Sequence, residues 1–275
     1  MNFSKMNGNG NDFLILNNMS LDYKTEELIN ITKKICRRKE ALGADGVLVI
    51  EPSVTDDFKM RLFNRDGSEG EMCGNGARCL ARYAYIKGVT KKNKMTFETL
   101  AGRVEAEVDG INVKLYLSPV DISDFVMNEK AEVEGYRFEY NFLTVGVPHT
   151  VIFEEKRLSN DEYYSYGKLI RNRLDLFPDG TNVNFVLINK DKKDTLDVIT
   201  YERGVEDLTL SCGTGSAACG IASCMLGITS DVVNVNNPGG VNQVSVERNG
   251  NIVFPKLTGR ALLVGEIDTT EEALY

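Results

Sequence analysis

Two short stretches of this sequence place a cysteine directly before glycines and small residues. Cys73 begins "CGNGARC", and Cys212 begins "CGTGSAA" 139 positions later. Each cysteine precedes a run that is compatible with a helix and that ends in a glycine, at Gly88 and Gly227, the usual residue just past a last helical turn. The two stretches therefore predict two helices, each with a cysteine immediately before its first turn.

A cysteine in that position has a defined chemistry. The first turn of a helix carries unpaired N–H groups and the positive end of the helix dipole, which together bind an anion such as a carboxylate. The same field lowers the pKa of a neighbouring thiol from its usual ~8.5, so that a thiolate forms near neutral pH. Two such thiols acting on one carbon atom could remove a proton from one face and return a proton to the other.

Other features recur at nearly the same separation as the two cysteines. Asn64 and Arg203 each lie nine residues before a cysteine, Asp12 of "NDFLIL" matches His149 of "PHTVIF", and the turn at Gly110 matches the turn at Gly250. A constant offset in chain order is the signature of an internal repeat. We therefore expect two copies of one α/β unit, each a mostly antiparallel sheet or barrel around a central helix.

Hydrophobic periodicity and turn residues place the remaining elements. Strands are predicted near 13–17, 47–51, 58–63, 150–154, 184–189 and 196–201, and further helices at about 25–37 and 160–175. "DG" at 109–110 and "NG" at 249–250 predict hairpins. We expect an N-terminal domain of residues 1–118 that residues 264–275 complete, and a C-terminal domain of residues 119–263.

Composition narrows the function classes. The 275 residues carry a net charge of −8, which disfavours a nucleic-acid or anionic-membrane surface. No apolar run approaches the ~18 residues of a membrane helix, and the first residues lack a signal-peptide pattern, so we expect a cytoplasmic protein.

The six cysteines indicate thiols in such a chain, not a disulfide framework. The absence of any C-x-x-C pair and the single histidine argue against a structural zinc site. Four of the cysteines are interpreted as buried structural thiols: Cys36, Cys79, Cys219 and Cys224.

Longer motifs resemble the diaminopimelate epimerase family, and the likeness runs through nearly the whole chain. They are "FSKMNGNGNDF", "GADGVLVIEP", "MRLFNRDGSEGEMCGNGARC", "GTNVNFV" and "YERGVEDLTLSCGTGS". The resemblance implies two pseudo-symmetric α/β domains with the active site in the cleft between them, no pyridoxal phosphate or other cofactor, and no metal. It also implies epimerisation of LL- to meso-diaminopimelate by a thiolate and a thiol, for lysine and peptidoglycan synthesis, with a homodimer as one possible assembly.

The resemblance implies roles for individual residues. Cys73 and Cys212 would be the base and acid pair, and His149 and Glu202 would tune their pKa values. Nine residues would hold the substrate: Asn11, Asn64, Gly74, Asn75, Asn182, Glu202, Arg203, Gly213 and Thr214. Four of them, the two glycines with Asn75 and Thr214 at the helix starts, would hold the reacting α-carboxylate. The chain departs from many family members at Val147, where asparagine is common, and in the linker "VEDLTLS" before Cys212.

The residue types alone leave simpler explanations open. Arg203 could grip a carboxylate through two parallel hydrogen bonds, but a surface ion pair with Glu202 or Glu206 would explain it equally well. Asn64 and Asn182 could be turn or cap residues, and His149 could be structural. The alternative functions are another cofactor-independent racemase, of the histidine or proline type, and a non-catalytic thiol-based ligand sensor.

Overall fold

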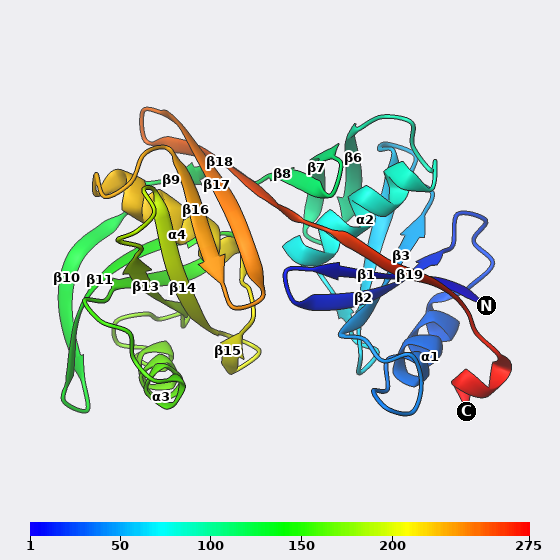
Figure 1. Cartoon of the computed structure of the whole chain (residues 1–275), viewed down its shortest axis with the longest axis horizontal. Coiled ribbons are helices and arrows are strands. Elements are labelled where there is room, and N and C mark those ends of the chain that lie inside the picture. The colour runs from blue at the N-terminus through cyan, green and yellow to red at the C-terminus, as the bar shows by residue number, and fades with distance from the viewer. The chain divides into compact units, whose positions relative to one another are not determined.

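The computed structural model describes residues 1–275, and the chain divides into two compact units. One unit comprises Met1–Leu115 together with Gly259–Tyr275, and the other comprises Tyr116–Thr258. Both are mixed α/β structures in which strands surround a central helix (Figure 1). None of the helices combines the length and the apolar character needed to cross a membrane.

The first unit contains β1–β8, α1 and α2 and receives the C-terminal segment. Its elements are β1 (Asn2–Gly8), β2 (Asn11–Asn17), α1 (Thr25–Ile35), β3 (Gly46–Glu51), β4 (Phe58–Asn64), β5 (Glu69–Gly70), α2 (Gly74–Ile86), β6 (Lys94–Thr99), β7 (Gly102–Asp109), β8 (Asn112–Tyr116), β19 (Leu262–Asp268) and the 3₁₀ helix η1 (Glu271–Leu274). The strand β19 pairs antiparallel with β1, so the two ends of the chain belong to one unit.

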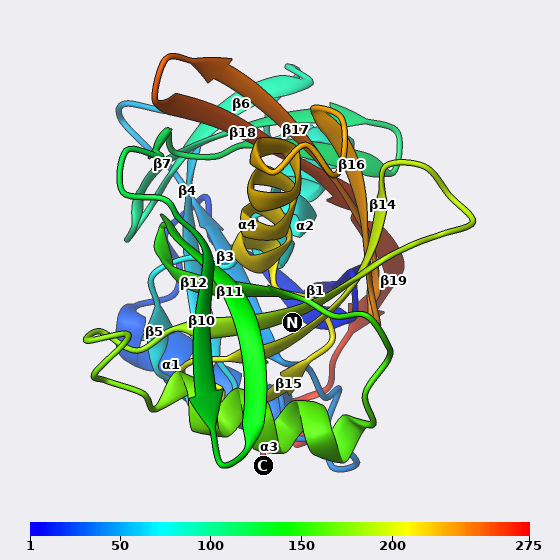
Figure 2. The ribbon, with the colours of Figure 1, turned by 90° about the vertical axis from the view of Figure 1, so that its left-hand side faces the viewer.

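The second unit contains β9–β18, α3 and α4. Its elements are β9 (Val120–Asp121), β10 (Val126–Val133), β11 (Tyr136–Val145), β12 (Val147–Phe153), α3 (Asn160–Arg171), β13 (Asn182–Ile188), β14 (Thr195–Glu202), β15 (Asp207–Thr209), α4 (Gly213–Met225), β16 (Val232–Asn237), β17 (Gly240–Asn249) and β18 (Ile252–Arg260). Within this unit, Figure 2 shows α4 among the strands and α3 along their outer side.

The two units repeat one pairing scheme. In the first, β2 runs parallel to β3, β3 antiparallel to β4, β4 antiparallel to β5 and parallel to β6, and β6 antiparallel to β7. In the second, β12, β13, β14, β15, β16 and β17 repeat each of these pairings in the same order. The duplicated α/β organisation predicted from the sequence is therefore confirmed.

The central helices are the buried elements of each unit. Helix α2 packs against β1, β2, β3, β4, β7 and β19, and α4 packs against β11, β12, β13, β16 and β17. Small residues permit this close enclosure: a Cβ on Gly220 of α4 would lie 2.8 Å from Val244 of β17. By contrast, α1 and α3 bury one face only, through Leu28, Ile31 and Ile35 in the first helix.

The predicted helices and strands are confirmed, with several boundaries that differ: α1 ends at Ile35 rather than near residue 37, and β12 begins at Val147 rather than near residue 150. Helix α3 ends at Arg171 rather than near residue 175. The side chain of Asn172 donates a hydrogen bond to the Lys168 carbonyl at 2.8 Å, satisfying one of the carbonyl groups that a helix end leaves without a partner. The predicted turns at Gly110 and Gly250 have φ values of 58° and 60°, a conformation in which glycine is favoured.

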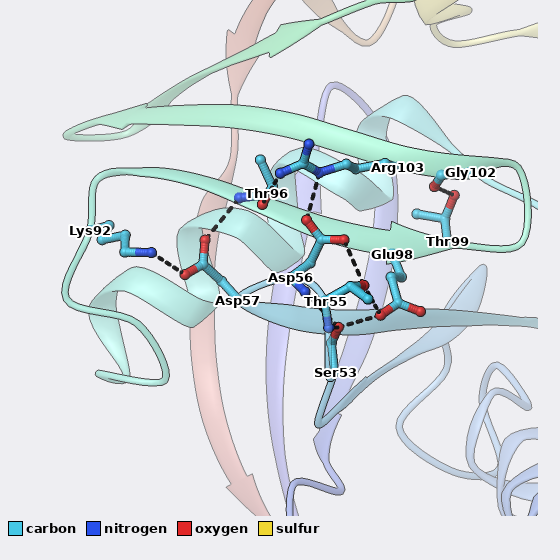
Figure 3. Close-up of polar contacts among 10 residues, drawn as sticks. All are labelled: Ser53, Thr55, Asp56, Asp57, Lys92, Thr96, Glu98, Thr99, Gly102 and Arg103. Carbon is cyan, nitrogen blue, oxygen red and sulfur yellow. Dashed lines mark hydrogen bonds and ion pairs between the residues drawn. The ribbon is translucent and has the colours of Figure 1, made fainter.

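Surface polar contacts fix the β6–β7 edge of the first unit (Figure 3). Asp57 accepts from the Lys92 ammonium at 2.8 Å and from the Thr96 backbone N–H at 3.0 Å, and Arg103 of β7 contacts Asp56 at 2.6 Å. These bonds connect the segment before β4 to β6, the strand that pairs parallel with β4. Strand β6 in turn pairs with β7, which contacts α2.

Candidate active site

Cys73 is the N-cap of α2. Its backbone is extended, with φ −137° and ψ 122°, and its carbonyl accepts the first helical hydrogen bond from the Ala77 N–H at 2.8 Å. The side chain is half-buried. Cys73 therefore stands immediately before the first turn of the helix, as predicted, although its side chain makes no cap hydrogen bond to the N–H groups of that turn.

Asn75, in the first turn of α2, is linked to Asn11 at the start of β2. The Asn75 side-chain amide nitrogen donates to the side-chain oxygen of Asn11 at 2.6 Å, and the Asn11 side-chain amide nitrogen donates to the Asp45 carboxylate at 3.1 Å. Asn75 is buried and Asn11 is half-buried. The first unit thus brings two of the predicted substrate-binding residues into contact beside the helix that Cys73 caps.

Asn64 is not part of this contact. It ends β4, is exposed, and donates a side-chain hydrogen bond to the Ser68 hydroxyl at 3.1 Å, while its backbone N–H donates to the Ser68 carbonyl at 2.8 Å. Its observed contacts are those of a turn residue, the simpler explanation that the sequence left open.

Cys212 is the N-cap of α4 and has an extended backbone like that of Cys73, but its side chain, unlike that of Cys73, also caps the helix. Its Sγ accepts a hydrogen bond from the Gly215 N–H at 3.3 Å and lies 3.5 Å from the Thr214 hydroxyl. The residue is 6% exposed, so this thiol is more buried than that of Cys73. A Cβ on Gly215 would lie 3.2 Å from the Cys212 Sγ and 2.5 Å from the Asn184 carbonyl oxygen, so this position has room for glycine alone.

Glu202 lies beside Cys212 in the second unit. It is the last residue of β14, and burial raises the pKa of its carboxyl, while the neighbouring Thr209 hydroxyl and Cys212 thiol oppose that rise. The predicted closeness of Glu202 to a reactive thiol is therefore present in the structure. A raised pKa favours the protonated carboxyl, which can donate a hydrogen bond to the neighbouring sulfur.

His149, on β12, is fully buried and electrically neutral near pH 7. Burial is the main cause that lowers its pKa to about 3, and the charge of Arg203 acts in the same direction. Its Nδ1 lies 3.3 Å from the side-chain nitrogen of Asn184, and its Nε2 has no hydrogen-bond partner.

The partners of Asn184 determine which nitrogen of His149 carries the proton. The Asn184 amide nitrogen also donates to the Thr150 carbonyl at 3.0 Å, and the Asn184 oxygen accepts from the Thr200 hydroxyl at 2.9 Å. The group that faces His149 Nδ1 is therefore an N–H donor, so Nδ1 accepts and the proton resides on Nε2. His149 is a neutral ring with a buried N–H donor that has no protein acceptor.

Asn182 and Arg203 lie in the neighbourhood of His149. Asn182 begins β13 and pairs in register with His149, and its side-chain oxygen accepts from the Arg203 backbone N–H at 2.7 Å. The Arg203 guanidinium donates to the Asp179 backbone carbonyl. Glu206 pairs with Arg171 and not with Arg203. Arg203 therefore does not form the surface ion pair with Glu206 that the sequence left open as an explanation.

The remaining predicted residues lie at the start of α4 or before β12. Gly213 starts α4, where a Cβ would lie 3.1 Å from Leu257, and Thr214 lies next to Gly146, where a Cβ would be 4.0 Å from the threonine methyl group. Val147, which departs from the family pattern, begins β12 two residues before His149.

Sequence reasoning missed two residues that support this site. Asn184 is a polar residue in a buried strand, and its separation of two from Asn182 places both side chains on one face, which was an available signal. Arg78 is fully buried between Ala77 and Cys79 on α2, and an arginine inside an otherwise apolar helical stretch was the corresponding signal there.

The other cysteines differ from the N-cap pair. Cys36, Cys79 and Cys219 are buried thiols, and burial raises the pKa of each. Cys224 is only half-buried, which corrects the prediction that it is buried, because it lies in the last turn of α4 where the helix emerges from the core. No group of three or more His, Cys, Asp or Glu side chains in residues 1–275 is arranged to hold a metal ion.

Comparison with known proteins gives a consistent family match. The family model for diaminopimelate epimerase matches residues 3–122 and 142–264. A diaminopimelate epimerase from Caldanaerobacter subterraneus subsp. tengcongensis is 40% identical over 271 residues, covering 92% of this chain and 94% of the relative. A diaminopimelate epimerase from Hydrogenobaculum sp. is 42% identical over 246 residues, covering 86% of this chain and 87% of the relative.

A solved structure shows the same fold at low sequence identity. A phenazine biosynthesis protein of the PhzF family from Bacillus anthracis matches 98% of this chain and 99% of its own, with a TM-score of 0.76 and 16% identity. The likeness in fold extends over the whole chain, including both units.

The neutral state of His149 predicts a specific pH dependence of stability. The unfolded chain binds a proton on this ring near pH ~6.5, whereas the folded chain does so only at about pH 3. The unfolded state therefore binds more protons between these values, so stability falls as the pH drops through this window, by about 2 kcal/mol from pH ~6.5 to ~5. The chain contains one histidine, so ¹⁵N NMR of histidine-labelled protein reports on this ring alone.

We expect the neutral, Nε2-protonated form in the folded protein both at pH ~6.5 and at pH ~5, because its pKa is about 3. The urea-unfolded protein is the matched control and should titrate near pH ~6.5. A folded-state ring that titrates at that same value would contradict this account of His149.

Proposed function

The chain belongs to the diaminopimelate epimerase family, and from that membership we propose that it interconverts LL- and meso-2,6-diaminopimelate by a two-base reaction. The reaction uses no pyridoxal phosphate and no metal, and it supplies lysine and peptidoglycan synthesis. The observation that carries this proposal is the duplicated N-cap: Cys73 and Cys212 each precede the first turn of the central helix in their unit.

The helix starts supply the binding groups for the substrate α-carboxylate. The backbone N–H groups of the first helical turns, from Gly74 and Asn75 in α2 and from Gly213 and Thr214 in α4, offer an anion the positive end of a helix dipole. Glycine directly after each cysteine allows the carboxylate to approach the backbone. Holding that group also stabilises the charge that develops on it when the α-proton leaves, because fixed N–H donors act most strongly where negative charge accumulates.

The proton transfers balance between the two cysteines. One cysteine, as thiolate, takes the α-proton and becomes a thiol, and the electron pair of the broken C–H bond spreads into the carboxylate. The other cysteine, as thiol, gives its proton to the opposite face of the carbon and becomes a thiolate. The configuration is inverted, and the enzyme is left with the protonation states of Cys73 and Cys212 exchanged.

Glu202 and His149 support the thiol chemistry in the second unit. The carboxyl of Glu202 lies beside Cys212, and when it is ionised its negative charge favours the protonated thiol over the thiolate there, whereas burial, which raises its pKa, favours the neutral acid. His149 is neutral and presents a buried Nε2–H without a protein acceptor, a donor suited to a developing negative charge or to a substrate oxygen.

Polar side chains hold the rest of the substrate in this proposal. Asn11, Asn64, Asn182 and Arg203 bind its amino groups and distal carboxylate, with the Arg203 guanidinium as the charged partner of that carboxylate. Val147 contributes no amide at the position where many family members have one. The required partner is the small amino acid itself, whereas a cytoplasmic location, a homodimer and the absence of nucleic-acid and membrane partners stay predictions from the sequence.

Replacement of either N-cap thiol tests the reaction directly. Cys73→Ser and Cys212→Ser should each lower the rate of LL- to meso-diaminopimelate conversion at least about a hundred-fold, because a serine hydroxyl is too weak an acid to supply the base. Chiral chromatography of the products measures the rate. Cys224→Ser, at the far end of α4, is the matched control and should keep wild-type activity.

The same assay separates this function from its alternatives. Proline, hydroxyproline and histidine are incubated in parallel with LL-diaminopimelate. Faster racemisation of any of these three would assign a different substrate, and no turnover of any of the four would leave the thiol pair without an epimerase role.

Substitution of Arg203 tests recognition of the distal carboxylate. Arg203→Ala should lower kcat/KM for diaminopimelate by an amount corresponding to about 2–5 kcal/mol, because it removes one partner of a desolvated ionic contact. Arg173→Ala is the matched control, since Arg173 pairs with Asp175 at the surface of the same unit. Unchanged kinetics in Arg203→Ala would point to a substrate without a second carboxylate.

A further inference from the structure

Arg78 is a charged side chain enclosed in the core of the first unit. It lies on α2, one turn after Asn75, and is 0% exposed. Its Nη2 donates to the side-chain oxygen of Asn75 at 2.6 Å, while Nε and Nη1 have no hydrogen-bond partner. A guanidinium stays protonated in proteins, and burying its charge without a counterion is costly, so a structural role alone does not account for this residue.

No carboxylate neutralises Arg78. Several charged side chains on the strands that pack against α2 form ion pairs with residues other than Arg78 (Figure 3 shows the pair at β7): Lys5 with Asp12, Arg61 with Glu51 and Glu69, Arg103 with Asp56, Glu105 with Lys94, Glu107 with Lys114, and Glu266 with Lys87. The positive charge of Arg78 therefore remains available to a negative group that forms near it during the reaction.

The groups whose charge acts on Arg78 are two cysteines. Burial lowers the pKa of the guanidinium, and the thiolates of Cys79 and Cys73 would oppose that shift. Cys79 is itself buried, with its pKa raised to about 12, so it stays a thiol near neutral pH. Cys73 is half-buried at the N-cap of α2, where the positive end of the helix dipole favours a thiolate.

Arg78 also orients the two asparagines proposed to bind substrate. Because its N–H occupies the Asn75 oxygen, the Asn75 amide nitrogen is turned toward Asn11, whose own amide nitrogen donates to Asp45. The chain of hydrogen bonds thus runs from a cation at one end to a carboxylate at the other, which fixes the direction of both amides.

We propose that Arg78 is a positioning residue of the epimerase site, whose buried charge stabilises the Cys73 thiolate and the substrate carboxylate at the start of α2 while it orients Asn75. This role rests on the proposed function of Cys73. It is confined to one half of the repeat, because the residue five positions after Cys212 is Ala217. Glu202, by contrast, lies ten positions before Cys212, where the first half has Phe63. Within this proposal Cys73 carries the thiolate of the resting enzyme and Cys212 the thiol.

The ionisation of each thiol can be measured without substrate. The rate of alkylation by iodoacetamide is followed against pH, and peptide mass spectrometry separates modification of Cys73 from that of Cys212. In the wild type we expect the midpoint for Cys73 to lie below that of Cys212 and below ~8.5, the ordinary thiol value. Arg78→Met should raise the Cys73 midpoint by about one pH unit or more, because it removes the nearby cation.

Arg82→Met provides the matched control. Arg82 lies one turn further along α2 and donates to the backbone carbonyls of Gly110 and Ala261, so this substitution removes a charge from the same helix while leaving the Cys73 midpoint unchanged. The acidic limb of the kcat/KM profile for diaminopimelate should move to higher pH in Arg78→Met and not in Arg82→Met. A loss of packing alone would lower activity at all pH values and would leave this limb in place.

Two outcomes overturn the proposal. One is a folded Arg78→Met protein whose Cys73 midpoint equals that of the wild type. The other is a wild-type alkylation midpoint for Cys73 that is equal to or above that of Cys212. This measurement needs no variant, so it tests the proposal even if Arg78→Met does not fold. Because alkylation requires no turnover, a protein that shows the expected midpoints but does not epimerise diaminopimelate would refute the proposed function and not the role of Arg78.

Discussion

The structure depends on one property of helices, namely that their first turn leaves N–H groups without intrahelical partners. In both units the residue before that turn is a cysteine, at Cys73 and Cys212, and the helix it caps is the central one, enclosed by strands. The surrounding strands fix the orientation of each helix, and the glycine after each cysteine leaves the backbone at the helix start accessible. The helix dipole acts on any charge that forms at that start. In the proposed function, both the activation of the thiols and the binding of the carboxylate therefore depend on the N–H groups and the dipole at the helix start.

The duplication explains why the same device occurs twice, and the differences between the copies explain how each thiol can have its own role. Around α2 the additional charge is a cation, Arg78, whereas beside Cys212 it is the carboxyl group of Glu202. A cation favours a thiolate and a carboxyl group favours a thiol. A repeat that kept both halves identical would give the two cysteines equal pKa values, and a reaction that needs one base and one acid benefits from their difference.

Much of this arrangement could be predicted from the sequence, because repeated motifs and helix boundaries are local signals. The cysteine N-caps, the helix stops before Gly88 and Gly227, and the strands that lead to each cysteine follow from periodicity and turn residues. Contacts that join distant segments could not be predicted from such signals: the Asn75–Asn11 bond, the Asn184 amide that fixes the His149 proton, and the enclosure of Arg78. Each depends on which side chains the sheet brings together, and polar residues in buried positions were the only local indication of them.

The central claim is that two different cysteines serve the two faces of one carbon atom, and hydrogen isotope transfer in the first turnovers tests it most directly. LL-diaminopimelate is added to the enzyme in deuterated water, and the α-carbon deuterium of product and of recovered substrate is measured by mass spectrometry at low conversion. Two bases predict product that carries deuterium and recovered substrate that stays protiated, because the proton returned comes from the thiol that did not take the first one. Deuterium distributed equally between substrate and product would show one base acting on both faces, and would contradict the account.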